Sequence, residues 1–352
     1  MINIWDYEFF FFVQNDISIL KVELLIELIC IASKQLLILI FLLIIKMIDR
    51  YLKILEKIKS NELILLDGAI GTELQKRGIV MNGSWCGTAS LQDYILKQIH
   101  IDYINSGSQI ITTNTYASSR IMLKAAGSEK QFKEINLKAI NSALNAREET
   151  KKFDVLIAGS ISHRYPIADG DVLSQAVVDV SKNELQDSTY EMLNLLSNNG
   201  CDLILLEMMY RPERMEVVFD VMRKSKLPVW VGFSFRKSET GEILSLTDER
   251  KVTFEEMMSL TKNYEFDVWG AMHTSVDIMG ECIEMIKENF NGPIFAYPDS
   301  GGWLSPNWTF DNVITPKNFI EKVKVWRSLG AQIIGGCCGT SPDHIKAISS
   351  IK

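Results

Sequence analysis

After Asn61 the sequence alternates short apolar runs with longer stretches of helical periodicity. Near-continuous apolar runs of strand length are typical of parallel strands that are buried on both faces. Eight such runs favour an α/β fold, a (β/α)8 TIM barrel built as a single domain. The predicted strands are Glu62–Leu66, Gln109–Thr112, Val155–Ala158, Leu203–Leu206, Val229–Phe233, Val268–Met272, Ile294–Tyr297 and Gln332–Ile334.

Amphipathic stretches separate most of these runs and predict the outer helices. An open doubly wound sheet is the alternative fold. It is disfavoured by the segment DGAIGTELQKRG from Asp67, which lacks the glycine spacing of a dinucleotide-binding turn. The predicted helices include Gln131–Lys151, Leu185–Asn198, Arg214–Lys224, Phe254–Asn263 and Asp277–Asn289.

Residues 1–46 form an additional hydrophobic segment before the barrel, which we assign to residues 47–352. Their apolar run Leu36–Ile45 is ten residues long, and a bilayer span needs about 20. No basic start precedes this run and no small-residue cleavage site follows it, so it is not a secretory signal. We interpret the extension as sequence upstream of a start at Met47, with a membrane-surface segment as the alternative. An amphipathic helix from Met47 is predicted to lead into the first strand.

The net charge and the spacing of the cysteines indicate which classes of partner and which compartment suit the chain. Its net charge is −7 and it has no stripe of Lys and Arg, which argues against a nucleic-acid surface. The spacing of its cysteines shows no disulfide framework, as is usual in a reducing cytosol. We expect a cytoplasmic protein with small-molecule substrates and no nucleic-acid or membrane partner, while a homo-oligomer stays open. The six cysteines are Cys30, Cys86, Cys201, Cys282, Cys337 and Cys338.

Chemically active side chains follow the predicted strands. In a TIM barrel the carboxyl ends of the strands meet at the rim that carries the active site. The residues at or just beyond these ends are Asp67, Gly68, Thr113, Asn114, Gly159, Ser160, Glu207, Ser234, His273, Tyr297–Ser300, Cys337 and Cys338.

The adjacent Cys337 and Cys338 lie in GGCCGTSPDHI, which begins at Gly335. Neighbouring side chains reach one point only from an irregular turn, which the flanking glycines permit. Zinc takes two thiolates readily, and a catalytic zinc site has three protein ligands and one open position. The alternative is a pair of half-buried thiols in a tight turn. Cys86 is a further candidate ligand that we interpret as a packed thiol, and we interpret Cys201 and Cys282 as structural.

From about Ile64 to Ile348 the chain resembles the homocysteine S-methyltransferase family of zinc-dependent barrels. The resemblance implies an enzyme that moves a methyl group to the thiol of homocysteine and forms methionine. It rests on LLDGAIGTELQKRG from Leu65, ITTNTYASS from Ile111, AGSI from Ala158, DLILLE from Asp202, YPDSG from Tyr297 and GGCCGTSPDHI.

The family holds its zinc with three cysteines, and this chain departs from that pattern. GAMHTSVD places His273 where the family has its first cysteine ligand. The resemblance therefore implies a Zn²⁺ bound by His273, Cys337 and Cys338. Two thiolates and a neutral imidazole leave the centre formally neutral instead of −1. In the alternative interpretation His273 only forms hydrogen bonds and the metal site is altered.

An amino-acid substrate needs groups for its ammonium and its carboxylate. We expect Asp67 and Glu207 to accept the ammonium protons, with Glu207 also among the catalytic residues. Backbone N–H groups near Gly159 and Ser160 are expected to meet the carboxylate. Asn114 would orient the substrate or the metal ligands. A carboxylate or amide at a strand end also often only caps the next helix.

Aromatic residues suggest a site for a cationic methyl donor. Tyr297, Trp303 and Trp308 could form a wall that attracts a sulfonium or quaternary ammonium through cation–π contacts. Asp299 would add a negative charge, and Arg164 would suit a donor carboxylate. Two other functions stay open: a component that takes its methyl group from a corrinoid on a partner protein, and a non-catalytic barrel that binds a thiol or metal. The sequence also leaves open whether the acceptor is homocysteine or another thiol or selenol.

Overall fold

The computed structural model describes residues 49–81, 85–166, 179–247, 250–304 and 307–352. The hydrophobic extension predicted over residues 1–46 lies outside these ranges. No helix within the described residues has the length and apolar character that crossing a bilayer requires.

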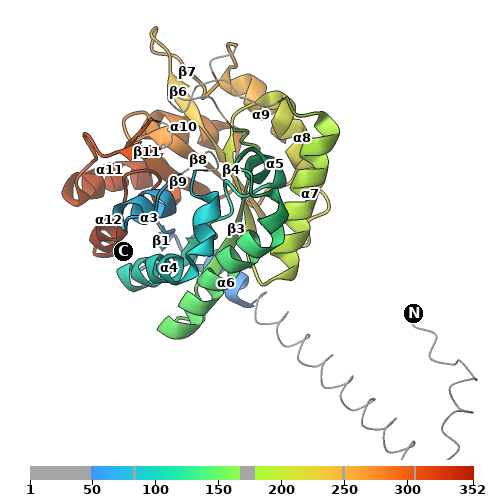
Figure 1. Ribbon diagram of the computed structural model, residues 1–352. Helices are drawn as coiled ribbons and strands as arrows, with labels where there is room; N and C mark the ends of the chain where they lie inside the picture. The colour runs from blue at the N-terminus through green and yellow to red at the C-terminus, as the bar shows by residue number, and fades with distance from the viewer. Residues whose placement is uncertain (1–48, 82–84, 167–178, 248–249, 305–306) are drawn as a thin grey trace, which may run out of the picture. The chain divides into compact units, whose positions relative to one another are not determined.

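Eight parallel strands form the predicted barrel sheet (Figure 1). Their order is β1-β12-β9-β8-β5-β4-β3-β2. Between the two end strands, the N–H of Gln109 donates to the carbonyl of Leu65 over 2.7 Å. The TIM barrel prediction is thus confirmed, with every predicted strand present. The bounds are β1 Ile64–Leu65, β2 Ile110–Thr112, β3 Leu156–Ser162, β4 Leu203–Met209, β5 Val229–Phe233, β8 Val268–Ser275, β9 Ile294–Asp299 and β12 Ala331–Ile334.

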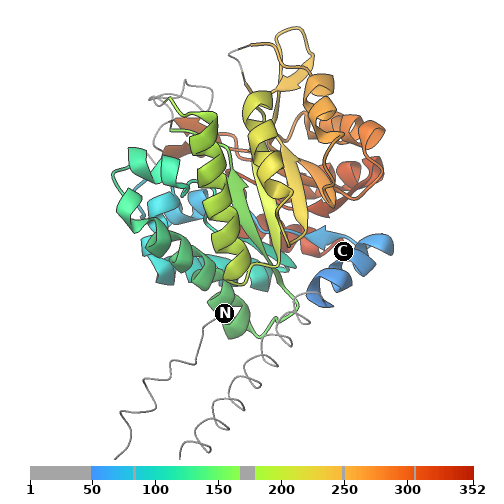
Figure 2. The same cartoon turned by 90° about the vertical axis from the view of Figure 1, so that its right-hand side faces the viewer.

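Helices surround this sheet, and Figure 2 shows α7 and α8 lying along the strands. The five predicted helices appear as α6, α7, α8, α9 and α10. Several of these helices are capped at the N-terminus by a side chain. Ser181, for example, forms a capping box with Glu184 at the start of α7. The helix bounds are α3 Ile70–Lys76, η1 Gly87–Leu91, α4 Asp93–Ser106, α5 Arg120–Ala125, η2 Glu129–Gln131, α6 Phe132–Thr150, α7 Lys182–Asn198, α8 Pro212–Met222, α9 Phe254–Thr261, α10 Met279–Asn289, α11 Pro316–Leu329 and α12 Pro342–Ser349.

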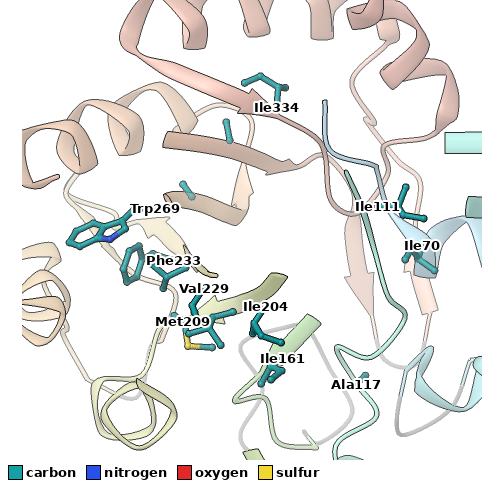
Figure 3. Packing of buried hydrophobic residues seen from close by; sticks show 14 of the residues in the cluster. Ile70, Ile111, Ala117, Ile161, Ile204, Met209, Val229, Phe233, Trp269 and Ile334 are labelled. Atoms are coloured by element: carbon teal, nitrogen blue, oxygen red, sulfur yellow. The ribbon is translucent and has the colours of Figure 1, made fainter. Parts of the chain in front are cut away.

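Alternate residues of the strands pack on opposite faces of the sheet, as the period of two requires. Leu203 and Leu205 join a cluster inside the barrel. Ile204 and Leu206 join the larger cluster between the sheet and the helices. Figure 3 shows part of that outer cluster, with Trp269, Phe233 and Met209 gathered on one side. Burial on both faces explains why the strands are apolar without interruption.

A helix over residues 49–59 closes the amino-terminal end of the barrel. Its Tyr51, Ile54 and Ile58 are buried in the inner cluster. The indole N–H of Trp230 donates to the Tyr51 hydroxyl over 3.1 Å. Asp202, the residue before β4, forms ion pairs with Arg50 and Arg147. With this end covered, the carboxyl ends of the strands are left as the accessible rim.

Two antiparallel hairpins that the sequence pattern did not predict follow β5 and β9. The first pairs β6 Phe235–Lys237 with β7 Ile243–Ser245, and it projects beyond the helices (Figures 1 and 2). The second pairs β10 Gly302–Leu304 with β11 Asn307–Thr309. Both contribute residues to the cavity at the rim.

Candidate metal centre and active site

A cavity of about 700 Å³ lies at the carboxyl ends of the strands. Residues from β1, β2, β4, β5, β8, β9 and β12 or the segments after them line it, whereas β3 contributes none among the described residues. Nine of the predicted rim residues are at its wall: Thr113, Asn114, Glu207, His273, Tyr297, Asp299, Ser300, Cys337 and Cys338.

His273, Cys337 and Cys338 lie together in this wall, as the sequence predicted. Their candidate ligand atoms are all within 4.8 Å of one another. The two sulfurs are 3.7 Å apart, and the Cys337 sulfur lies 3.1 Å from Nδ1 of His273. Two sulfurs bound tetrahedrally at about 2.3 Å from zinc would be about 3.8 Å apart. Donor type and spacing therefore fit a tetrahedral ion that keeps a fourth position open.

The vicinal thiols are held by an irregular turn after β12. The N–H of Gly336 donates to the Asp67 carbonyl, and the N–H of Cys337 donates to the Pro298 carbonyl over 2.7 Å. Gly339 has φ +83°, and a Cβ there would lie 2.7 Å from the Ser300 carbonyl oxygen. Only glycine fits this position comfortably. The expectation that glycines bring both thiols to one point is met.

His273 and Glu207 are aimed into the cavity by breaks in their strands. The pairing of β8 with β9 shifts between Met272 and Ser275, and His273 has φ +45°. A similar shift in β4 includes Glu207, and the adjacent Met208 has φ +58°. Such bulges re-aim side chains and are common beside active sites. Nε2 of His273 consequently lies 3.1 Å from Oε2 of Glu207.

The ligand cluster has strongly shifted pKa values. The hydrogen bond from Cys337 is the main cause that lowers the pKa of Cys338 to about 5, and His273 and Trp308 add to it. Burial raises the pKa of Cys337 well above its usual range. Burial alone would lower the pKa of His273, but contacts with Cys338 and Glu207 raise it to about 9. Two adjacent thiolates therefore need a further cation, which a metal ion would provide.

The β10–β11 hairpin brings a hydrogen-bond donor to the candidate metal centre. Nε1 of Trp308 donates to the Cys338 sulfur over 2.9 Å. Gln75 of α3 holds Trp308 in place, since its side-chain amide bonds both the N–H and the carbonyl of that residue. The sequence identified Trp308 as an aromatic wall residue, but its bond to the thiol and the role of Gln75 depend on a hairpin that was not predicted.

Asp67 is not at the cavity wall. Its carboxylate is fully buried and accepts hydrogen bonds from the N–H and hydroxyl of Thr112 and from the hydroxyl of Tyr297. Burial raises its pKa to about 7. Asp67 therefore ties β1 to β2 and β9 and is not among the residues that line the cavity, so its contact with a substrate ammonium stays a prediction. Tyr297 does line the cavity.

Gly159 and Ser160 are also away from the cavity wall. β3 continues to Ser162 instead of ending at Ala158, so both residues lie inside the strand. A Cβ on Gly159 would point toward Leu196 of the helix layer. The N–H of Ser160 is already bonded to the Thr113 hydroxyl. Neither residue lines the cavity, and their contact with a substrate carboxylate stays a prediction.

Asn114 lines the cavity, but its amide holds the neighbouring loop. Its Nδ2 donates to the Cys86 carbonyl over 2.9 Å and to the Ser90 hydroxyl over 3.0 Å. The Cys86 thiol donates to Oδ1 of Asn114. Burial raises the pKa of Cys86 to about 12, so it is a packed, protonated thiol.

Aromatic rings form a continuous series along the cavity wall. Tyr116 stacks on His273 with ring centroids 5.3 Å apart, and Trp85 stacks on Tyr116 at 5.4 Å. Trp303 follows at 4.9 Å from Trp85, and Trp308 at 4.6 Å from Trp303. Sequence reasoning missed Trp85, which follows no strand directly and has φ +54°.

Of the charged residues expected near a donor, Asp299 lines the cavity and Arg164 does not. The Asp299 carboxylate accepts from the N–H of Gly301 over 3.0 Å. Arg164 is buried behind the wall, where it donates to the Tyr210 hydroxyl over 2.6 Å and lies over the Trp85 ring. Arg164 therefore supports the aromatic series from outside.

A TIM barrel with two thiols and an imidazole gathered at its open rim is an enzyme scaffold with a candidate catalytic metal centre. Comparison with known proteins narrows this class. The family model for homocysteine S-methyltransferase matches residues 64–351. The chain belongs to this family and is therefore a methyltransferase.

Individual relatives agree with this assignment. Selenocysteine methyltransferase of Astragalus bisulcatus is 27% identical over 322 residues, covering 83% of this chain and 93% of the relative. Homocysteine S-methyltransferase YbgG of Bacillus subtilis is 25% identical over 302 residues, covering 82% of this chain and 94% of the relative. The crystal structure of the metallated form of homocysteine methyltransferase MmuM from Escherichia coli superimposes with a TM-score of 0.66 at 22% identity, covering 83% of this chain and 96% of MmuM. This last likeness concerns the fold.

Proposed function

We propose that this protein transfers a methyl group from a sulfonium or quaternary ammonium donor to the thiol of homocysteine, with Zn²⁺ held by His273, Cys337 and Cys338. The observation that carries the proposal is the grouping of these three side chains within 4.8 Å at the wall of the rim cavity. A zinc ion bound there would keep the acceptor sulfur as a thiolate near neutral pH.

The acceptor amino acid would be oriented by Glu207. Oε2 of Glu207 bonds to His273, and among the described residues Oε1 has no hydrogen-bond partner. A carboxylate oxygen at the cavity wall suits the substrate ammonium. Because Asp67 is engaged in the barrel, Glu207 is the better placed of the two predicted acids. Its role is thus to place the acceptor sulfur beside the metal ligands.

The donor would lie against the rings of Tyr116, Trp85 and Trp303. Cation–π attraction to these faces favours a positively charged onium group and excludes water from it. Asp299 adds a carboxyl group to the same wall. As the new S–C bond forms, the bond from the methyl carbon to the onium atom breaks, and its electron pair neutralises the donor. Alignment of the two reactants supplies much of the acceleration.

Labelled methyl transfer tests this function. The full chain is loaded with zinc and given homocysteine with methyl-labelled S-methylmethionine, S-adenosylmethionine or betaine, beside the Cys338→Ala variant. We expect the parent chain to form labelled methionine with at least one onium donor. The Cys338→Ala variant should form much less of it. Labelled product from methylcobalamin alone would favour the corrinoid alternative. Absence of product from every donor would favour a non-catalytic thiol-binding barrel.

A further inference from the structure

The two ring nitrogens of His273 have different neighbours. Nδ1 lies 3.1 Å from the Cys337 sulfur. Nε2 lies 3.1 Å from Oε2 of Glu207 and 3.9 Å from the same sulfur. The side chains of His273 and Glu207 are only 13% and 9% exposed, so water competes little for this contact.

A neutral imidazole carries one proton, and its position decides which nitrogen can bind a metal. An ionised carboxylate only accepts hydrogen bonds, so Glu207 favours the proton on Nε2. The lone pair is then on Nδ1, the nitrogen nearer to the Cys337 sulfur. A carboxylate in this relation to a metal-binding histidine also raises the basicity of the ligand.

The backbone and the neighbouring ring hold this orientation. Both His273 and Met208, next to Glu207, have positive φ, which non-glycine residues seldom adopt. The Tyr116 ring lies nearly parallel to the imidazole, at 25°. Turning the imidazole over would separate Nε2 from the carboxylate and Nδ1 from the sulfur.

We propose that Glu207 is a positioning residue for the metal centre, which fixes His273 with its proton on Nε2 and Nδ1 as the metal ligand. The inference rests on the proposed zinc site. Where the family has a third thiolate ligand, this chain then has a neutral imidazole that donates a hydrogen bond to the Glu207 carboxylate. The negative charge of the third thiolate is thus replaced by that of Glu207, which lies behind the ligand and does not bind the metal itself. Oε1 of Glu207 remains for the acceptor ammonium.

The nitrogen assignment is tested directly by NMR of the full chain, labelled with ¹⁵N-histidine and loaded with zinc. We expect one histidine to have a metal-bound Nδ1 and a protonated Nε2, and His273→Ala to remove that signal. A metal-bound Nε2 in His273 would overturn the inference while leaving the zinc site intact. A parent chain that binds zinc no better than Cys338→Ala would overturn the proposed function together with the inference.

Zinc affinity, measured by chelator competition, tests the role of Glu207. Glu207→Leu removes the acceptor, and we expect affinity to fall about 10- to 100-fold. Glu207→Gln keeps an oxygen acceptor without the charge, so its zinc affinity should fall less than that of Glu207→Leu. Glu149→Gln, at an exposed ion pair with Lys97, is the matched control and should keep parental affinity. Parental affinity in a folded Glu207→Leu variant would contradict the proposal.

Discussion

The indole N–H of Trp308 donates to the sulfur of Cys338 over 2.9 Å, from a hairpin that lies outside the barrel sheet. A donor at this distance stabilises a thiolate. It also lowers the negative charge that the sulfur presents to a metal. The β10–β11 hairpin is therefore part of the candidate metal centre and not only a cover over it.

Replacing Trp308 by Phe should raise the pKa of Cys338 from its value of about 5, because a hydrogen bond that stabilises the thiolate is lost. The pH dependence of alkylation of the metal-free protein reports this pKa. Trp303→Phe is the matched control on the same hairpin, since the buried Nε1 of Trp303 has no hydrogen-bond partner among the described residues. Equal alkylation profiles for the two variants would show that the indole N–H does not act on the thiol.

Asp67 should make the protein less stable as the pH rises from about 4 to about 7. Its pKa is raised from 3.8 to about 7 by burial, so the folded state binds the proton more tightly than the unfolded state. The stabilising effect is complete below pH 3.8 and is lost as the pH passes 7. Asp67→Asn should flatten this part of the profile of melting temperature against pH. If the melting temperature of Asp67→Asn fell with rising pH as steeply as that of the parent, the pH dependence would belong to other groups.

Removing a ring from the aromatic wall should weaken binding of the donor more than that of the acceptor. A cation–π contact contributes about 0.5 to 2 kcal/mol, so Trp85→Leu should raise the KM for the onium donor about 2- to 30-fold. The KM for homocysteine should change little. Phe153→Leu, at an exposed ring outside the cavity, is the control. An equal rise in both KM values would indicate general damage to the site.

The helix over residues 49–59 should be required for stability, and residues 1–46 should not. A chain that begins at Met47 keeps Tyr51, Ile54 and Ile58, which are buried in the inner cluster. Each such side chain stabilises the fold by about 1.5 to 3 kcal/mol. Chemical unfolding should therefore find the Met47 chain as stable as the full chain, and a chain beginning at Asn61 several kcal/mol less stable. Equal stability of all three would contradict the role assigned to the helix.

The barrel could be predicted from the sequence because strands buried on both faces must be apolar without interruption. The grouping of His273 with Cys337 and Cys338 followed from their places at the ends of β8 and β12. Strand ends were less predictable: β3 extends past Ala158 because Gly159 and Ser160 pack as strand residues. This is why two expected substrate contacts lie away from the cavity.

Other features depend on backbone geometry that residue types do not reveal. The contact between Glu207 and His273 arises from two bulges with positive φ at non-glycine residues. Trp85 and Gln75 follow no strand directly, so their positions depend on loops and on a hairpin. Asp67 looked like a rim carboxylate, whereas its hydrogen bonds with Thr112 and Tyr297 turn it into the barrel.

Whether His273, Cys337 and Cys338 bind zinc is decided by the metal content of the purified full chain, measured by elemental analysis beside His273→Ala and Cys338→Ala. We expect about one zinc per chain in the parent and its loss in both variants, because a catalytic site needs all three protein ligands. Full zinc content in His273→Ala, or no zinc in the parent, would contradict this expectation.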